Sequence, residues 1–173
     1  MPTIAPLDAV PTAMHEALLD SVFGPDRTSR TAYRIREGLD RLDALSFAAL
    51  DDEGYLAGTI ELWPVSLTDE DGKQYPMLMV GPVAVAPSRQ NEGYGRALMA
   101  AALGAVEGPA TPETPALPQV LIGDPEYYDK WDFVAGPTAG WDTPGPVERH
   151  RLLVRCANPS VLPPRGMLGP WRS

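Results

Sequence analysis

One stretch of the chain decides the fold, and it reads Gly81-Pro82-Val83-Ala84-Val85-Ala86-Pro87-Ser88-Arg89-Gln90-Asn91-Glu92-Gly93-Tyr94-Gly95-Arg96. Its first half is apolar and continues the run Met77-Leu78-Met79-Val80, so residues 76–86 are expected to form a strand buried on both faces. Its second half is a turn with two glycines. Residues 93–106 are rich in Ala, Leu and Met without an internal proline, which predicts a helix.

The glycine turn at the start of this helix is a candidate anion site. The first N–H groups of a helix have no intrahelical partner, and the helix dipole adds partial positive charge. Gly93 and Gly95 let a pyrophosphate approach the backbone, while Arg89 and Arg96 could donate charge-assisted hydrogen bonds. The same glycines are also compatible with a plain turn or with close helix packing. The third glycine of a dinucleotide fingerprint and the Gly-Lys-Ser or Gly-Lys-Thr of a P-loop are absent.

Hydrophobic periodicity predicts the elements on either side of this stretch. Helices are expected at residues 9–23, 28–42 and 126–131, and strands at residues 45–50, 55–65, 119–122 and 147–155. The acidic turn Asp51-Asp52-Glu53-Gly54 favours an antiparallel hairpin, and residues 76–86 are expected at the centre of the sheet. The predicted order is α, α, β, β, β, α, β, α, β.

Length and composition favour a single globular domain over residues 1–173. The prolines, 20 in number, cluster between elements rather than inside them. The segment 159–173 contains Pro163-Pro164 and Gly169-Pro170, and it is compatible with a terminal strand, a dimer arm or a disordered tail. A homodimer is therefore left open.

Net charge and cysteine content argue against several kinds of partner and binding site. A net charge of -9 argues against nucleic acid, because affinity for phosphates depends largely on Lys and Arg. Cys156 is the single cysteine, so no intrachain disulfide and no cysteine-based zinc site is expected. The loop Asp69-Glu70-Asp71-Gly72 would need a carboxylate at position twelve to bind calcium, where Leu78 stands, so no metal is expected. No apolar run approaches a membrane span, and a cytoplasmic location is expected.

The motifs together resemble the GNAT N-acetyltransferase superfamily. The resemblance rests on residues 81–87 combined with Gln90-x-x-Gly93-x-Gly95, and it extends to Val120-Leu121-Ile122-Gly123-Asp124-Pro125-Glu126-Tyr127-Tyr128, which is similar to a segment of the YhbS-like branch. It covers roughly residues 45–155. It implies an α/β (α+β) fold with a mixed, mostly antiparallel central sheet that is flanked by helices and splayed at the fourth strand.

The resemblance implies acetyl-CoA as the cosubstrate, with pantetheine held in the splay. Pro82 lacks an N–H and suits a bulge, which would free the neighbouring peptide groups to pair with the pantetheine amides. The implied cofactor-binding residues are Val83, Ala84, Val85, Gln90, Asn91, Glu92, Gly93, Tyr94, Gly95 and Arg96.

The resemblance also implies catalytic roles. Tyr128 matches the tyrosine that protonates the departing thiolate, with core packing as the alternative, and Tyr127 is expected to pack. Glu61 is a candidate base, with a solvent-facing position in an alternating strand as the alternative. The N–H of Val83 is expected to meet the developing oxyanion. His15 and His150 are interpreted as surface or packing residues.

The implied function is transfer of an acetyl or short acyl group from acetyl-CoA to a primary amine of a small molecule or peptide, by direct attack in a ternary complex. The alternative is a non-catalytic acyl-CoA-binding sensor or dimeric scaffold. One position departs from the resembled family, because Asp132 precedes Phe133 where a glycine is usual. A positive φ at this position would strain any residue other than glycine, although Asp tolerates it better than most.

Overall fold

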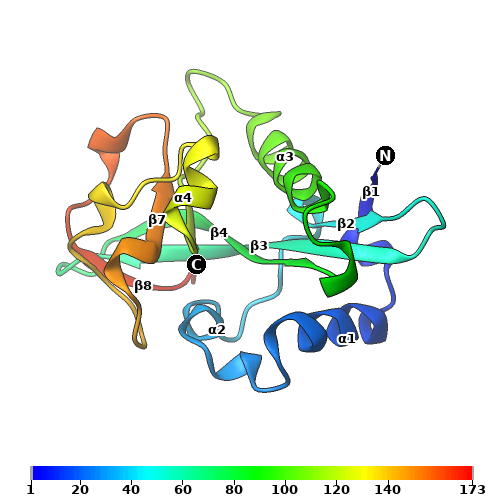
Figure 1. Ribbon diagram of the computed structural model, residues 1–173. Helices are drawn as coiled ribbons and strands as arrows, with labels where there is room; N and C mark the ends of the chain where they lie inside the picture. Colours follow the sequence, from blue (N-terminus) through cyan, green and yellow to red (C-terminus); the bar gives the residue numbers. More distant parts are fainter. Residues whose placement is uncertain (1, 173) are drawn as a thin grey trace. The chain divides into compact units, whose positions relative to one another are not determined.

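The computed structural model describes residues 2–172, which form helices and strands in the order drawn in Figure 1. The helices are α1 (Thr12–Phe23), α2 (Thr31–Ile35), α3 (Tyr94–Glu107) and α4 (Pro125–Tyr128). The strands are β1 (Thr3–Pro6), β2 (Phe47–Leu50), β3 (Leu56–Thr68), β4 (Gln74–Val85), β5 (Gln119–Ile122), β6 (Trp141–Asp142), β7 (Leu152–Arg155) and β8 (Gly166–Pro170).

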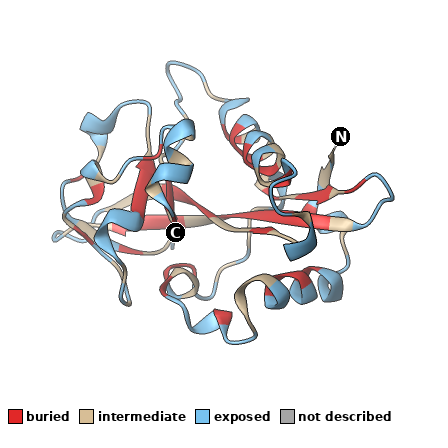
Figure 2. Cartoon of the chain, viewed as in Figure 1, coloured by how far each residue is buried: buried red, intermediate tan, exposed pale blue. Residues whose placement is uncertain are grey.

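The sheet is mixed and mostly antiparallel, as expected. Its main strand order is β1-β2-β3-β4-β5-β7, so β4 is an interior strand. The pairs β1–β2, β2–β3, β3–β8 and β5–β7 are antiparallel, while β4–β5 and β6–β8 are parallel. Buried residues concentrate on these strands (Figure 2).

The chain divides into two compact units, and β3 and β4 each contribute residues to both. The first unit contains residues 2–28, 41–62 and 81–116, and the second contains residues 29–40, 63–80 and 117–172. The splay expected beside β4 would involve residues of both units and stays a prediction. The expectation of a single domain also stays a prediction.

In the first unit, α1 and α3 lie on opposite sides of the strands (Figure 1). Gly93 precedes α3 with φ +91°, a left-handed conformation that glycine adopts without strain. The helix then buries one face against β1 and β2; that face consists of Tyr94, Leu98, Met99, Ala102, Leu103 and Val106. This spacing of three and four residues is the amphipathic pattern that the sequence predicts.

In the second unit, the core surrounds Trp141, which is fully buried and donates its indole N–H to the carbonyl of Pro163 at 2.8 Å. The segment 159–173 contributes a strand here, because Val65 to Thr68 of β3 pair with β8. The terminal-strand alternative is therefore correct for residues 166–170. The parallel pairing of β4 with β5 joins Leu78 to Gln119 and Met79 to Val120.

Two expectations about elements are wrong, and the short strands β1 and β6 were not predicted. The helix predicted over 28–42 is only the short α2, since Gly38 takes φ +77° and the N–H of Leu42 donates to the carbonyl of Leu62 instead. The strand Thr3–Pro6 was not predicted, because it is held by pairing with β2 rather than by its own pattern. The strand predicted over 147–155 begins only at Leu152, after a single 3-10 turn over residues 149–151.

Among residues 2–172, none of the helices combines the length and the apolar character that crossing a membrane requires.

Candidate functional site

The turn that precedes α3 has the backbone of an anion site. Asn91 and Gly93 take left-handed conformations, with φ of +65° and +91°. They bring the chain from the end of β4 to the first residues of α3, whose opening N–H groups have no partner within the helix. A Cβ placed on Gly93 would meet no atom within 4 Å, so the space beside this backbone is open. Of the two glycines of the turn, Gly93 has a positive φ, whereas Gly95 lies inside α3 and has none.

The side chains of the turn are less suited to bind an anion than its backbone. Tyr94 is buried in the core, so at this position only its N–H is available to a ligand. Glu92 is exposed, negatively charged and 3.8 Å from a guanidinium nitrogen of Arg89. Arg96 is exposed and lies in the first turn of α3, where its side chain adds a positive charge.

Two side-chain contacts hold the turn in place. Gln90 donates through Nε2 to the carbonyl of Val85, at 2.9 Å. Arg89 binds Oδ2 of Asp51 through Nη2, at 2.7 Å. The guanidinium of Arg89 therefore anchors the turn to the β2–β3 hairpin, a structural role that the sequence did not indicate.

The carboxylate of Asp51 is held in position by the backbone of its own hairpin turn. Its Oδ1 accepts the N–H groups of Tyr55 and Glu53, both at 2.9 Å, and its side chain is 5% exposed. The hydrogen bond from Tyr55, the one from Glu53 and the contact with Arg89 together keep the pKa of Asp51 below its ordinary value.

The end of β4 presents two peptide groups away from β3. The N–H of Ala86 donates to the carbonyl of Ala57 at 2.7 Å, and the carbonyl of Ala84 lies against Gly58. Alternate residues of a strand direct their peptide groups to opposite sides. Val83 and Val85 therefore direct theirs away from β3, as pairing with an extended ligand requires.

Gly58 makes this arrangement possible. A Cβ at this position would lie 2.6 Å from the carbonyl oxygen of Ala84 and 3.0 Å from Cδ1 of Leu98. Both β4 and α3 thus approach β3 as closely as they do because residue 58 has no side chain.

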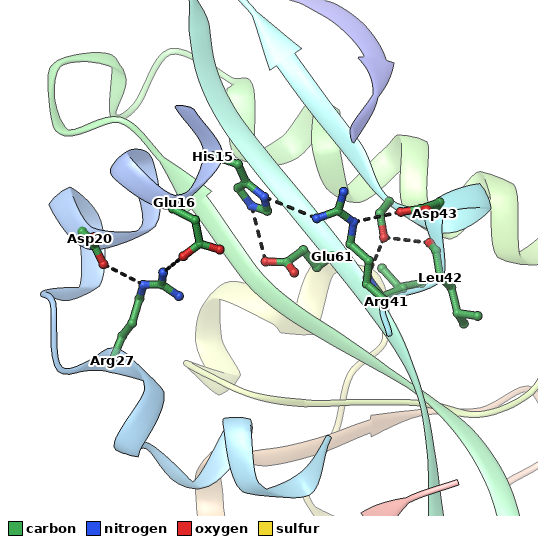
Figure 3. Close-up of polar contacts among 10 residues, drawn as sticks. His15, Glu16, Asp20, Arg27, Arg41, Leu42, Asp43 and Glu61 are labelled. Carbon is green, nitrogen blue, oxygen red and sulfur yellow. Dashed lines mark hydrogen bonds and ion pairs between the residues drawn. The ribbon is translucent and has the colours of Figure 1, made fainter. Parts of the chain in front are cut away.

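Glu61, the candidate base, is buried on the α1 side of β3. Its side chain is 5% exposed, so the solvent-facing alternative is wrong. Its Oε2 lies 3.4 Å from Nε2 of His15, whose side chain is 4% exposed (Figure 3). Nδ1 of His15 lies 3.5 Å from Nη1 of Arg41, which in turn binds Asp43. His15 is therefore buried, as the packing interpretation expects, and it also has an ionisable neighbour, Glu61.

Tyr128, the candidate acid, stands at the end of α4 in an aromatic cluster. Its ring centroid lies 4.9 Å from that of Tyr127 and 6.1 Å from that of Phe133. A Cβ on Gly123 would come within 2.5 Å of the Tyr128 ring, so the glycine leaves room for it. Burial and the neighbouring Tyr127 raise the pKa of Tyr128 to about 12. The phenol therefore stays protonated through the physiological range.

Three further predicted positions, Tyr127, Asp132 and His150, are exposed. Tyr127, expected to pack, is 39% exposed and carries Lys130 over its ring at 4.3 Å. Asp132 has φ +68°, so the expected positive φ is present and is carried by a residue other than glycine. His150 is exposed, 3.5 Å from Glu148. Residues 2–172 contain no group of three His, Cys, Asp or Glu side chains arranged to hold a metal.

The family model described as "Acetyltransferase (GNAT) domain" matches residues 13–110, more than half of the chain. The chain belongs to the GNAT acetyltransferase family. The match includes Glu61, residues 83–85 and the whole glycine turn, while Tyr128 lies beyond it. Among curated GNAT relatives, the uncharacterized N-acetyltransferase YhbS of Escherichia coli strain K12 is 29% identical over 118 residues, which are 68% of this chain and 65% of that protein. The aligned region thus spans slightly less than two thirds of the relative.

Solved GNAT structures have the same fold. YhbS from Escherichia coli, crystallised in complex with CoA, gives a TM-score of 0.70 at 21% identity, covering 99% of this chain and 89% of that one. A GNAT family acetyltransferase from Brucella melitensis, crystallised in complex with acetyl-CoA, gives 0.60 at 24% identity, covering 96% and 93%. These likenesses confirm a mixed sheet flanked by helices.

Proposed function

We propose that the protein transfers an acetyl or short acyl group from acetyl-CoA to a primary amine of a small molecule or peptide. The observation that carries the proposal is the open turn at Gly93, which leads from β4, with the outward-directed peptide groups of Val83 and Val85, into the unpaired N–H groups at the start of α3. Membership of the GNAT family supports it, as do the CoA and acetyl-CoA complexes of proteins with the same fold.

The residues fit this cosubstrate. A pyrophosphate would accept hydrogen bonds from the N–H groups at the start of α3, where the helix dipole favours negative charge. Arg96 would add charge from its side chain. The pantetheine amides would pair with Val83 and Val85 as an added strand does.

Amine acylation then requires proton transfers by the chain's own residues. A primary amine with the ordinary pKa of about 10.4 is charged at neutral pH and must lose a proton before it attacks the thioester. We propose that Glu61 accepts this proton. The N–H of Val83 donates to the carbonyl oxygen as negative charge develops there. Tyr128 supplies the proton to the leaving sulfur as the C–S bond breaks.

The pKa of Tyr128 limits how that last step can occur. A phenol with a pKa of about 12 is a weaker acid than a thiol with an ordinary pKa of about 8.5. Complete transfer from Tyr128 to a free thiolate would therefore be unfavourable by roughly 5 kcal/mol. Tyr128 is therefore expected to stabilise the charge that develops on the sulfur by donating a hydrogen bond during C–S cleavage, and the proton transfer is completed as the phenolate regains a proton from solvent.

Binding and turnover are tested separately. Calorimetry should detect CoA and acetyl-CoA, and acetyl-CoA at about 100 times its Kd should raise Tm by roughly 5–10 °C. Gly93→Val should abolish binding, because a β-branched residue cannot adopt φ +91° without strain and its side chain would fill the open space. The matched control is Gly104→Val, an exposed position in α3 with open space and no positive φ. Normal binding by a folded Gly93→Val protein would contradict the site.

Turnover is measured as thiol release from acetyl-CoA with a panel of diamines, amino acid amides and short peptides. Release that depends on one class of amine supports transfer and names the acceptor class. Tight CoA binding without release for any amine would favour the sensor alternative.

A further inference from the structure

We propose that His15 positions Glu61 as the general base by presenting its Nε2–H to the carboxylate that receives the proton of the amine. This inference rests on the proposed function, because it concerns the base of that reaction.

The first support is the direction of the hydrogen bond from Arg41. A guanidinium has five N–H donors and no acceptor, and it stays protonated in proteins. Nη1 of Arg41 lies 3.5 Å from Nδ1 of His15, so Nδ1 must be the acceptor there. A neutral His15 then carries its single proton on Nε2, which is the nitrogen 3.4 Å from Oε2 of Glu61. Arg41 thus selects the tautomer that can donate to Glu61.

The second support is that the side chain of Arg41 is itself fixed. Its Nε donates to Oδ1 of Asp43 at 2.9 Å, on the far side of the guanidinium from His15 (Figure 3). The neighbouring charges on α1 are engaged elsewhere, since Arg27 binds both Glu16 and Asp20. Among residues 2–172, the charged groups found in contact with the imidazole are Glu61 from β3 and Arg41, which in turn binds Asp43.

The third support is the incomplete hydrogen bonding of the cluster. Nε2 of His15 and Oγ1 of Thr59 are buried without an aligned hydrogen bond among the described residues. Thr59 is fully buried and lies two residues before Glu61, on the same face of β3. A buried polar group without a partner costs roughly 1–3 kcal/mol, and such groups concentrate at functional sites. A purely structural pair would be replaceable by apolar residues at little cost.

The distance of 3.4 Å fits a base that is not yet engaged. Catalytic hydrogen bonds are often long before the substrate binds and shorten in the reactive complex. Glu61 then takes a proton from the amine nitrogen, this nitrogen forms its bond to the acyl carbon, the C–S bond breaks, and the sulfur takes a proton from Tyr128. His15 keeps its own proton throughout.

The test combines kinetics with spectroscopy. With the best amine of the panel, His15→Leu should lower kcat about 10- to 100-fold, leave the affinity for CoA unchanged, and move the acidic limb of the kcat/KM profile to higher pH. His15→Gln, whose amide can donate from a position near Nε2, should recover most of the rate. His150→Leu is the control and should match the wild type. The double variant His15→Leu/Glu61→Gln should be no slower than Glu61→Gln alone, because His15 acts through Glu61.

Nitrogen-15 NMR of the imidazole rings checks the tautomer without any turnover. The chain has 2 histidines, so His15→Gln assigns both sets of signals. We expect a neutral His15 ring with the proton on Nε2, and a mixture of tautomers in Arg41→Met. A proton on Nδ1 would overturn this inference and leave the proposed function standing. So would a double variant in which the reductions of kcat from His15→Leu and Glu61→Gln multiply. Absence of wild-type turnover with every amine would overturn the proposed function and this inference with it.

Discussion

Replacing Gly58 with alanine tests whether the approach of β3 to β4 and α3 holds the cofactor segment in place. The new Cβ would lie 2.6 Å from the carbonyl oxygen of Ala84 and 3.0 Å from Cδ1 of Leu98. The leucine methyl could move aside, but the oxygen belongs to the backbone between Val83 and Val85. Relief of the clash must therefore displace β4.

Overpacking a close contact by one methyl costs about 1–3 kcal/mol. For a chain of this length, we expect Gly58→Ala to lower Tm by roughly 3–10 °C. Displacement of β4 should also weaken CoA binding by about 5- to 50-fold, because the peptide groups of Val83 and Val85 no longer align with the ligand.

Gly104→Ala is the matched control, since it adds the same methyl to the same unit in open space. It should raise stability by about 0.5–1 kcal/mol, the usual difference between alanine and glycine inside a helix. Urea denaturation and CoA calorimetry on both variants separate the effects. A Gly58→Ala protein with wild-type stability and wild-type CoA affinity would refute the reasoning.

Two further predictions concern the second unit. Tyr128→Phe should lower kcat about 10- to 1000-fold without changing CoA affinity, as measured by thiol release and calorimetry. The pKa of Tyr128 is about 12, so the phenol loses its proton only near that pH and should cause no fall in the wild-type rate between pH 8 and 10. A fall of the rate in this range that Tyr128→Phe removes would contradict the assignment. Asp132 has φ +68°, so Asp132→Gly should be more stable in urea than Asp132→Val by about 1–3 kcal/mol, and equal stabilities would contradict strain at this position.

The sequence predicted the parts of the site that depend on local signals. A run of strong helix formers begins at Arg96, three residues after Gly93, so the turn and α3 could be recognised without knowledge of the rest of the chain. The strand over residues 76–86 could be recognised from its continuous apolar run, although β4 begins two residues earlier. Asp132 could be expected to take a positive φ because the family resemblance marks that position for glycine.

The features that sequence analysis missed depend on contacts between distant segments. The exposure of Glu61 could not be read from alternation along β3, because whether a face is buried depends on what covers it. Here α1 covers the face and brings His15 to Glu61. The role of Arg89 was missed for the same reason, since its partner Asp51 belongs to a turn from which the sequence predicted only an antiparallel hairpin. The Asx pattern of Asp51, which accepts N–H groups two and four residues ahead, is the one local signal that could have identified a structural role.

The alternation of β3 links the two halves of the proposed chemistry. Gly58 meets α3 and β4, which carry the cofactor segment, whereas Glu61 meets His15 on α1. These residues are three apart, and an odd separation in a strand places them on opposite faces. The sequence Gly58-Thr59-Ile60-Glu61 therefore sets both the closeness of the cofactor segment and the burial of the base. A shift of one residue in the pairing of β3 would exchange the two faces, placing the carboxylate of Glu61 on the α3 side and an apolar residue, Ile60 or Leu62, at the position beside His15. The antiparallel register Phe47 to Ile60 and Ala48 to Thr59 prevents that exchange, so β2, which carries none of the proposed site residues, determines on which side of β3 the base lies.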